Sequence, residues 1–500
     1  MSDVRGRRRN GVASGELGRL EESSTEQVTG SSTQVVSNRR ILSGNLSRAI
    51  LGLAGPMLVS SVLHNMQSLI DLYWVGRLGP VAVAALALSS VVLMAMFPIQ
   101  MGLATGTVAL VSRAYGSGDR ARASSLAAQS LTLGLIIGAV IGVMALPFLG
   151  TICRMLGAEP DVVRESVRYL WPNMIGMPIG LILFLASSSM QASGNTVVPM
   201  VAILISNMLN MVLDPLFIFG WGWIPGGGVA GAAWATILAQ VITAVGLIWL
   251  LFKGRTNLYL HWPDFKPIWR DSLNFIKIGL PSVGQMSSRS LMNLVFFGII
   301  AKFGTFVVAG YGIGSRWHMV LLMPCFVLGN ATATMVGQNL GAGQPLRARR
   351  AAWCSWGMIS LVMAGSALLL YMFVEESIAF FDSTPEVVEV GVSYLCAVLP
   401  FYVFTGISIV TERALSGAGC TVATMVSTII ALWGVQVPLA LLLSGSVAWT
   451  GMPGLAEFIG RVFDPSTQGV WWAMNIATLI NMAMLTFWFS TGRWMSKEIG

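Results

Sequence analysis

Long runs of uncharged, apolar residues recur along almost the whole chain and restrict its fold more than any other feature. A helix that crosses a bilayer needs about 20 predominantly apolar residues. Only 10% of the 500 residues are charged, whereas a soluble domain averages about 25%. Because backbone groups in lipid must be hydrogen-bonded within their own segment, the runs predict helices. We therefore expect an all-α, polytopic membrane protein with twelve transmembrane helices.

The basic residues gather in loops and tails and so indicate the topology. They lie near the N-terminus, after the second, sixth and eighth predicted spans, and at the C-terminus, for example at Arg113, Arg120, Lys253, Arg347 and Lys497. If the spans alternate, all of these segments fall on one side, and basic loops are typically cytoplasmic. The sequence thus predicts a plasma-membrane protein with both termini inside. The net charge of +8 reflects topology and does not indicate nucleic-acid binding.

The termini and the cysteines limit the other possibilities. Residues 1–45 are polar and are expected to form a disordered cytoplasmic tail. They contain no short apolar core after a basic start, so they do not resemble a cleaved signal peptide. The five cysteines show no CxxC spacing and the three histidines are isolated, so neither a disulfide framework nor a zinc site is expected. No cofactor is expected.

The chain also repeats itself with one constant offset. Gly116, Gly118, Arg122 and Ala123 recur 225 positions later, and so do Pro56, Gly194, Thr196 and Met200. Both basic loops of the repeat face the same side, so an even number of spans separates them. This predicts two parallel six-helix lobes with a cavity between them, an arrangement found in transporters. The expected boundaries are 46–252 for the N-lobe, 253–272 for a cytoplasmic linker and 273–500 for the C-lobe.

A polar stripe with a carboxylate interrupts the apolar run of residues 205–220. Asn207, Asn210 and Asp214 are spaced i, i+3, i+7 and share one helical face. Pro215 follows and leaves a backbone carbonyl of the preceding turn without its helical donor. An ionisable group at mid-bilayer costs roughly 2.5–3.5 kcal/mol and usually has a function. We interpret this stripe as part of a buried site for a proton or another cation.

A second stripe lies on the first span and ends in another acid. His64, Gln67, Ser68 and Asp71 share one face, and Asp71 and Asp214 lie at matching depths in their predicted helices. The nearest basic candidate partner is Arg168, at the outer start of the fourth span. Two unpaired carboxylates in a low-dielectric site cannot both stay ionised, so at least one binds H⁺ or a metal ion. His64 is expected to be a hydrogen-bonded packing residue rather than a proton relay.

The seventh span carries a third stripe with a different charge. Gln285, Arg289 and Asn293 are spaced i, i+4, i+8, and Arg289 lies deep in the span without a partner that the sequence identifies. Glu412 lies near the cytoplasmic end of the tenth span and is expected to form a surface ion pair with the neighbouring Arg413. The residues expected to line a cavity are His64, Gln67, Ser68, Asn207, Gln285, Arg289 and Asn293.

Five segments resemble the multidrug and toxic compound extrusion (MATE) family of membrane transporters. They are Gly55–Gly79, Asn210–Gly220 with its NMVLDPLFIFG sequence, Gly226–Gln240, and the LGAGQ and ALSGAG loops at Leu340–Gln344 and Ala414–Gly419. The resemblance covers nearly all of residues 46–495. It implies a V-shaped efflux antiporter, not an enzyme, that expels small drug-like molecules against an inward H⁺ or Na⁺ gradient.

The resemblance also implies residue roles. It assigns coupling of H⁺ or Na⁺ to Asp71, Asn210 and Asp214, with Thr236 as a weaker match, and the first three would hold the metal ion if Na⁺ is used. Family members that couple through the C-lobe carry acids on the seventh and tenth helices. Arg289 stands about where one such acid would be expected, so the N-lobe is the expected coupling site.

Other functions remain open from the sequence. A related lipid-linked oligosaccharide flippase would need several Arg or Lys residues in its cavity, and Arg289 alone favours it. An intramembrane enzyme, such as a prenyl transferase, would need paired aspartate motifs for Mg²⁺, and no span contains them. A channel is less compatible with parallel repeats and paired acids. The expected partners are the bilayer and a small-molecule substrate, with no nucleic acid, and the protein is expected to be a monomer.

The topology can be tested at the two repeated loops. Single cysteines at Gly118 and Gly343, introduced into a cysteine-free protein, should react with an impermeant reagent only from the cytoplasmic side, because both loops are basic. An external position for either loop would contradict the parallel repeat.

Overall fold

The computed structural model describes residues 41–222, 224–445 and 466–497, which are almost entirely helical. Most of the expected tail, residues 1–40, lies outside the described residues. The helices of the first half are α2 (Leu46–Gly76), α3 (Pro80–Met94), α4 (Phe97–Gly116), α5 (Arg120–Ala145), η1 (Leu146–Phe148), α6 (Leu149–Met155), α7 (Pro160–Ala192), α8 (Val197–Phe219) and α9 (Val229–Phe252). A two-stranded antiparallel ribbon, β1 (Gly220–Trp221) and β2 (Ile224–Pro225), joins α8 to α9.

After the short helix η2 (Trp262–Phe265), the second half follows the same order. Its helices are α10 (Trp269–Ala301), α11 (Thr305–Gly341), α12 (Pro345–Met372), α13 (Val374–Ala379), α14 (Pro385–Val398), η3 (Leu399–Phe401), α15 (Tyr402–Gly417), α16 (Thr421–Ile429), η4 (Ile430–Gln436), α17 (Val437–Leu443), α19 (Thr467–Ser490) and η5 (Arg493–Met495).

The described residues contain the twelve expected spans. Ten helices are long and apolar enough to cross a membrane, counting consecutive pieces such as α14, η3 and α15 as one. The helices α3 and α4 form another span with a bend of 41°. The remaining span is α10, whose 33 residues reach about 50 Å although it carries charged residues such as Lys277 and Arg289. The expectation of an all-α, twelve-helix protein is therefore confirmed.

The backbone carries the repeat that the sequence indicates. Four pairs of glycines with left-handed φ angles are separated by the same 225 positions, because each pair ends or joins corresponding helices. Their φ angles are 108° and 101° at Gly79 and Gly304, 85° and 69° at Gly118 and Gly343, 87° and 80° at Gly194 and Gly419, and 81° and 67° at Gly220 and Gly445. L-residues rarely adopt these angles, so glycine is the suitable residue at each turn.

The two halves differ where helices bend. The continuous helix α11 corresponds to the bent pair α3–α4, and the continuous α7 corresponds to α14 and α15, which η3 separates. The counterpart of α8 contains the π-helical turn η4 between α16 and α17. Turns of this kind are rare and often lie at functional sites. The repeat thus fixes the order of the helices but not their local geometry.

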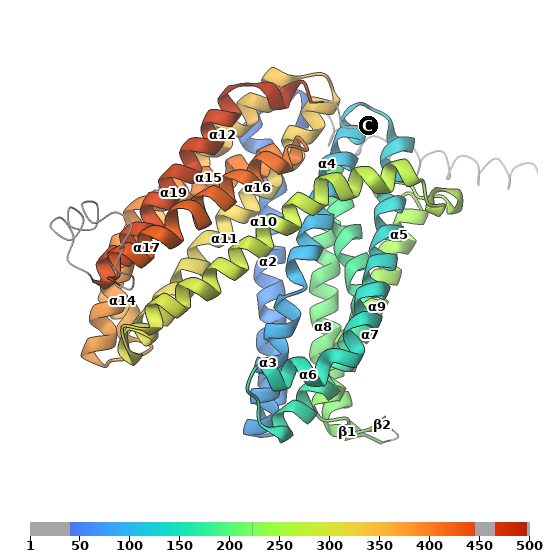
Figure 1. Ribbon diagram of the computed structural model, residues 1–500. Helices are drawn as coiled ribbons and strands as arrows, with labels where there is room; N and C mark the ends of the chain where they lie inside the picture. The colour runs from blue at the N-terminus through green and yellow to red at the C-terminus, as the bar shows by residue number, and fades with distance from the viewer. Residues whose placement is uncertain (1–40, 223, 446–465, 498–500) are drawn as a thin grey trace, which may run out of the picture.

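Figure 1 shows two groups of helices that meet at one end and diverge toward the other. They meet at the end that carries the basic loops, where α4 of the first half packs against α10 and α11 of the second. We call this end of the protein the closed end. The contact is made through backbone: a Cβ atom at Gly116 would overlap the carbonyl oxygen of Gln338, and one at Gly341 would overlap that of Arg113. Nε2 of Gln338 also donates a 2.7 Å hydrogen bond to the carbonyl of Ala192. Glycine therefore permits the close approach of the two halves.

The segment between the halves is fixed to the first one. Nε2 of Gln129 on α5 donates hydrogen bonds to the carbonyls of Asp264 and Lys266 at 2.5 and 2.6 Å. Arg122, at the start of α5, forms a bidentate ion pair with Asp271 in the first turn of α10, at 2.5 and 2.8 Å. Helix α10 thus begins on the first half and continues into the second, as Figure 1 shows.

The glycine contact at the closed end yields a test. Gly341→Ala would place a methyl group against the backbone of α4, and overpacking of this kind costs about 1–3 kcal/mol. A change of about 1.4 kcal/mol shifts an equilibrium tenfold. We therefore expect a cysteine at the buried Ser112 to be labelled about tenfold faster from the basic-loop side. Gly246→Ala, which meets nothing within 4 Å, is the control. Equal labelling in both variants would contradict the proposed role of this contact.

Candidate functional site

A buried polar cluster joins α2, α8 and α9 inside the first half of the protein. We call it the acidic cluster; it consists of Asp71, Asn210, Asp214 and Thr236, all less than a tenth exposed. Nδ2 of Asn210 donates hydrogen bonds to Oδ1 of Asp214 at 2.9 Å and to Oγ1 of Thr236 at 3.1 Å. The carboxyl group of Asp71 interacts with the side chains of Asp214 and Asn210. The structure thus brings together the four residues that the sequence assigned to cation coupling.

Two hydrogen bonds set the orientation of this cluster. Nδ2 of Asn207 donates to the backbone carbonyl of Leu63 at 2.5 Å and so fastens α8 to α2 one turn before Asn210. This contact turns the polar face of α8 toward α2, where Asp71 lies two turns beyond Leu63. The hydroxyl of Thr236 donates to the carbonyl of Ala232 at 3.1 Å, which leaves its lone pairs to accept from Asn210. Thr236 therefore orients the amide group of Asn210.

Three oxygen atoms of the acidic cluster have no hydrogen-bond partner among the described residues: Oδ1 of Asp71, Oδ1 of Asn210 and Oδ2 of Asp214. Buried oxygens without donors are costly, about 1–3 kcal/mol each. Two adjacent carboxylates in a low-dielectric site cannot both be ionised without a compensating cation. Carboxyl and amide oxygens bind protons and hard cations, so the arrangement suits one H⁺ or one Na⁺.

The acidic cluster contains two carboxyl groups, an amide and a hydroxyl. Over the described ranges, no group of three or more His, Cys, Asp or Glu side chains could hold a metal ion. A Na⁺ ion here would rely on two carboxyl groups and neutral oxygens. Arg168, the basic residue considered as a partner for the acids, instead pairs with Glu165 at 2.9 Å and is largely exposed.

Helix α7 contributes a residue that the sequence analysis missed. Tyr169 is buried and lies within electrostatic range of both Asp71 and Asp214. It packs with Val75 and Ile218, which belong to the helices that carry the two acids. The internal repeat could have indicated it, because Tyr394 stands 225 positions later on the corresponding helix.

The rest of the stripe on α2 behaves differently from Asp71. His64 and Ser68 are exposed and make no hydrogen bond with other described residues, while Gln67 is partly buried. Among the described residues, His64 therefore lacks the hydrogen bond that was expected of it, and its packing role stays a prediction. The neighbouring helices cover α2 at Asp71 but leave its side chains exposed at His64, two turns earlier. Residues on the same face of a helix therefore need not be equally buried.

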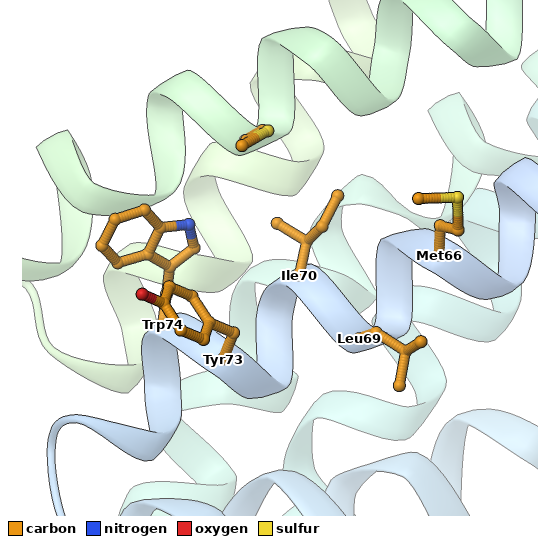
Figure 2. A pocket seen from close by; sticks show the side chains of 6 residues that line it. Met66, Leu69, Ile70, Tyr73 and Trp74 are labelled. Atoms are coloured by element: carbon orange, nitrogen blue, oxygen red, sulfur yellow. The ribbon is translucent and has the colours of Figure 1, made fainter.

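An apolar groove lies on α2 and α8, the helices that carry Asp71 and Asp214. Figure 2 shows that its lining side chains project from consecutive turns of α2; they are Met66, Leu69, Ile70, Tyr73 and Trp74, joined by Met211 of α8. Trp74 also packs against Phe219 with 6.3 Å between ring centroids, and it belongs to the apolar surroundings of Tyr169. Methionine is flexible and polarizable, so such a surface can adapt to varied apolar molecules.

The second half has no acidic cluster at the corresponding position. The counterparts of Asp71 and Tyr169 are Phe296 and Tyr394, which belong to a buried aromatic group with Tyr311 and Trp471. The rings of Tyr311 and Trp471 stack with centroids 5.6 Å apart, and those of Tyr394 and Trp471 meet edge to face at 4.9 Å. Aromatic packing thus replaces the polar cluster.

The polar stripe on α10 does not converge on one site. Nε2 of Gln285 donates to Thr428 at 2.8 Å and its Oε1 accepts from Thr424 at 3.3 Å, which joins α10 to α16. Asn293 is exposed. Between them, Arg289 reaches into the second half and pairs with Glu412 at 2.6 Å.

The interpretation of Glu412 as a surface residue paired with Arg413 is wrong. Glu412 is 2% exposed and its partner is Arg289, 123 positions earlier in the chain. The surrounding helices of the second half bury the end of α15, so its acid cannot reach solvent. Arg413 is also buried, 8% exposed, and its guanidinium lies 5.7 Å from the ring of Phe326.

The hydrogen bonds of Asn210 give a stability prediction. Asn210→Ala removes the donor to both Asp214 and Thr236, and leaving one partner of a buried hydrogen bond unsatisfied costs about 1–3 kcal/mol. We expect a lower melting temperature of the purified protein in detergent. Asn293→Ala is the matched control, because an exposed substitution usually changes stability by less than about 0.5 kcal/mol. Equal melting of the two variants would count against the geometry of the cluster.

Comparison with known proteins identifies the family. A family model described as MatE matches residues 56–216 and, a second time, residues 281–442. The chain is 28% identical over 449 residues to a probable multidrug resistance protein, YpnP, of Bacillus subtilis, covering 87% of this chain and 98% of that protein. It is 24% identical over 455 residues to a probable multidrug resistance protein, NorM, of Thermotoga maritima, covering 91% and 94%.

Another relative and a solved structure complete the comparison. The chain is 27% identical over 403 residues to a protein of Shewanella oneidensis named FAD transporter, covering 80% of this chain and 89% of that protein. A crystal structure of MATE in the bent conformation shares the fold with a TM-score of 0.81 at 24% identity, covering 91% and 97%. Because the family model matches twice and covers more than half of the chain, the chain belongs to the MATE family of membrane transporters.

Proposed function

We propose that this protein is a secondary active multidrug efflux antiporter that exports organic compounds, often cationic, in exchange for H⁺ or Na⁺. The observation that carries this proposal is the acidic cluster, where Asp71 and Asp214 interact with each other and three oxygens lack a donor. Such a site changes its charge when it takes up or releases one cation. It can therefore link the movement of an ion to that of a substrate.

The coupling follows from the charge of the acidic cluster. With neither H⁺ nor Na⁺ bound, the cluster carries excess negative charge and attracts a cationic substrate. A cation that enters from outside neutralises Asp71 and Asp214, which weakens that attraction and favours release of the substrate. Loss of the cation to the cytoplasm restores the charge. Because binding free energies are reciprocal, substrate binding must also weaken cation binding.

The apolar groove supports the substrate class. It lies on the two helices that carry the acids, with Ile70 next to Asp71 and Met211 one turn before Asp214. An organic cation could place its apolar body there and its charge toward the carboxyl groups. Relatives are named both for multidrug resistance and for FAD transport, so the charge of this chain's own residues must indicate its substrate.

Several further expectations belong to this proposal. The two lobes would be residues 46–252 and 273–500, joined by residues 253–272, and they would move against each other. The protein would be a monomer in the plasma membrane. The closed end in Figure 1 would face the cytoplasm, together with both termini. A lipid-linked oligosaccharide flippase is less well supported, because the first lobe presents acids where a pyrophosphate would need cations.

The proposal predicts the behaviour of the acid variants. Asp71→Asn and Asp214→Asn keep the shape of the side chain but remove its charge, so both should insert normally and lose gradient-driven efflux to near background. Because the two residues act as one site, the double variant should be no worse than either single one. The measurement is efflux from proteoliposomes with H⁺ and Na⁺ gradients imposed separately.

The matched control is Asp161→Asn, an exposed acid in the first turn of α7. It should transport like the unaltered protein under both gradients. The gradient that drives the unaltered protein identifies the coupling ion. Normal efflux by both Asp71→Asn and Asp214→Asn at matched protein amounts would place coupling elsewhere.

A further inference from the structure

We propose that the C-lobe contains a recognition site for the carboxylate of an organic substrate, formed by Arg289 with Arg413 beside Glu412. The inference rests on the proposed transport function and specifies its substrate class: compounds that carry a carboxylate, including zwitterions, rather than purely cationic compounds. We call these three residues the basic cluster.

The basic cluster contains more positive than negative charge. Nη2 of Arg289 meets Oε2 of Glu412 at 2.6 Å, and Arg413 interacts electrostatically with both residues. Two guanidinium groups thus lie within electrostatic range of one carboxylate, and only Arg289 is paired with it. The other described acids of this half lie in or next to α13 and in the first two turns of α10 and α14, and none of them is among the charges that act on Arg413. A buried excess charge is costly in a membrane protein and favours a bound ion of opposite sign.

Arg413 is held in place without a full set of hydrogen-bond acceptors. Its Nε atom is buried and has no partner among the described residues, and its guanidinium faces the ring of Phe326. Its stem fits against α11 only because residue 329 is glycine: a Cβ atom there would lie 2.8 Å from Cγ of Arg413. The fold therefore makes room for a second cation beside Glu412.

Arg289 is the accessible member of the basic cluster. Its side chain is 26% exposed, whereas that of Glu412 is 3% exposed. A guanidinium has five N–H donors, and only the one to Glu412 has a partner within the described part of the chain. The remaining donors form a planar fork, which matches the two oxygens of a carboxylate. A carboxylate that reaches Arg289 from the exposed side would neutralise the excess charge.

The neighbouring contacts hold Arg289 at this position. One residue before it, the hydroxyl of Ser288 accepts a 2.8 Å hydrogen bond from Nε1 of Trp433, which lies in the π-helical turn η4. One turn earlier, Gln285 is fixed to α16 through Thr424 and Thr428. These bonds fix α10 against the C-lobe, so the fork of Arg289 is positioned in advance of binding.

The test compares two dyes that differ only in their carboxylate. Tetramethylrhodamine carries a free carboxylate and its methyl ester does not, so the ratio of their dissociation constants isolates recognition of that group. Binding to the purified full-length protein is measured by fluorescence polarisation in detergent, without any ion gradient. We expect the carboxylate dye to bind about tenfold more tightly than the ester, which corresponds to about 1.4 kcal/mol.

Two variants should change this ratio in opposite directions. Arg289→Gln removes the accessible fork and should bring the ratio to about one. Glu412→Gln removes the competing carboxylate and should increase the preference, by about another tenfold.

Arg289→Lys keeps the charge but not the planar fork and should retain part of the preference. Arg316→Gln, at an exposed position on α11, removes a C-lobe charge outside the basic cluster and is the control.

The outcomes separate this inference from the proposed function. No preference for the carboxylate dye, no binding of either dye, or a preference that survives Arg289→Gln would overturn the inference. An equal loss of the preference for the carboxylate dye in Arg289→Gln and Glu412→Gln would overturn it too, because a purely structural ion pair predicts that result. Melting temperatures of all variants show whether they are folded. Because no gradient is used, failure here leaves the efflux result for Asp71 and Asp214 unaffected, and the converse also holds.

Discussion

The cost of burying charge in a membrane determines the two most informative places in this protein. In the N-lobe, two carboxyl groups meet without a basic partner among the described residues, and in the C-lobe two guanidinium groups lie within electrostatic range of one carboxylate. Hydrophobic packing cannot compensate the excess negative charge of the first group or the excess positive charge of the second, because lipid and apolar side chains solvate charge equally poorly. We propose that each excess charge is compensated by a partner that binds and leaves, an ion in the N-lobe and a substrate in the C-lobe. The remaining helices mainly hold these two groups at fixed positions.

The internal repeat shows that the difference in charge between the two halves does not come from the order of their helices. Both halves use the same helix order and the same left-handed glycines, so the fold alone would permit an acidic cluster in each. In the C-lobe, however, Phe296 stands in place of Asp71, and the aromatic group around Trp471 fills the space. Aromatic packing of this kind is rigid and cannot change its charge. The first half thus contains two adjacent carboxyl groups, whereas the second contains an aromatic core and the pair of Arg289 and Glu412 on α10 and α15.

Much of the fold and part of the site followed from sequence, and the reasons differ by residue. Helical periodicity placed Asn210 and Asp214 on one face, and matched depth paired Asp214 with Asp71, because both inferences need only spacing along a helix. The pairing of Arg289 with Glu412 did not follow, since their separation of 123 residues says nothing about which helices become neighbours. The burial of each residue could not be predicted either. His64 shares a face with Asp71 but is exposed, because burial depends on how far the adjacent helices extend. Tyr169 carried no local signal and becomes recognisable only through its counterpart Tyr394.

The closed end explains how two such rigid lobes could separate. Its central contacts place glycines directly on the backbone of the opposite helix, so they depend on shape and involve few specific side-chain bonds. The hydrogen bond from Gln338 to the carbonyl of Ala192 can be exchanged for one to water when the lobes part. By contrast, the ion pair of Arg122 with Asp271 holds the start of α10 on the N-lobe, while Gln285 and Arg289 hold its later turns in the C-lobe. Any movement of the lobes must therefore bend or rotate α10, the helix that carries Arg289. The charge recognised by the C-lobe and the opening of the closed end consequently act on the same helix.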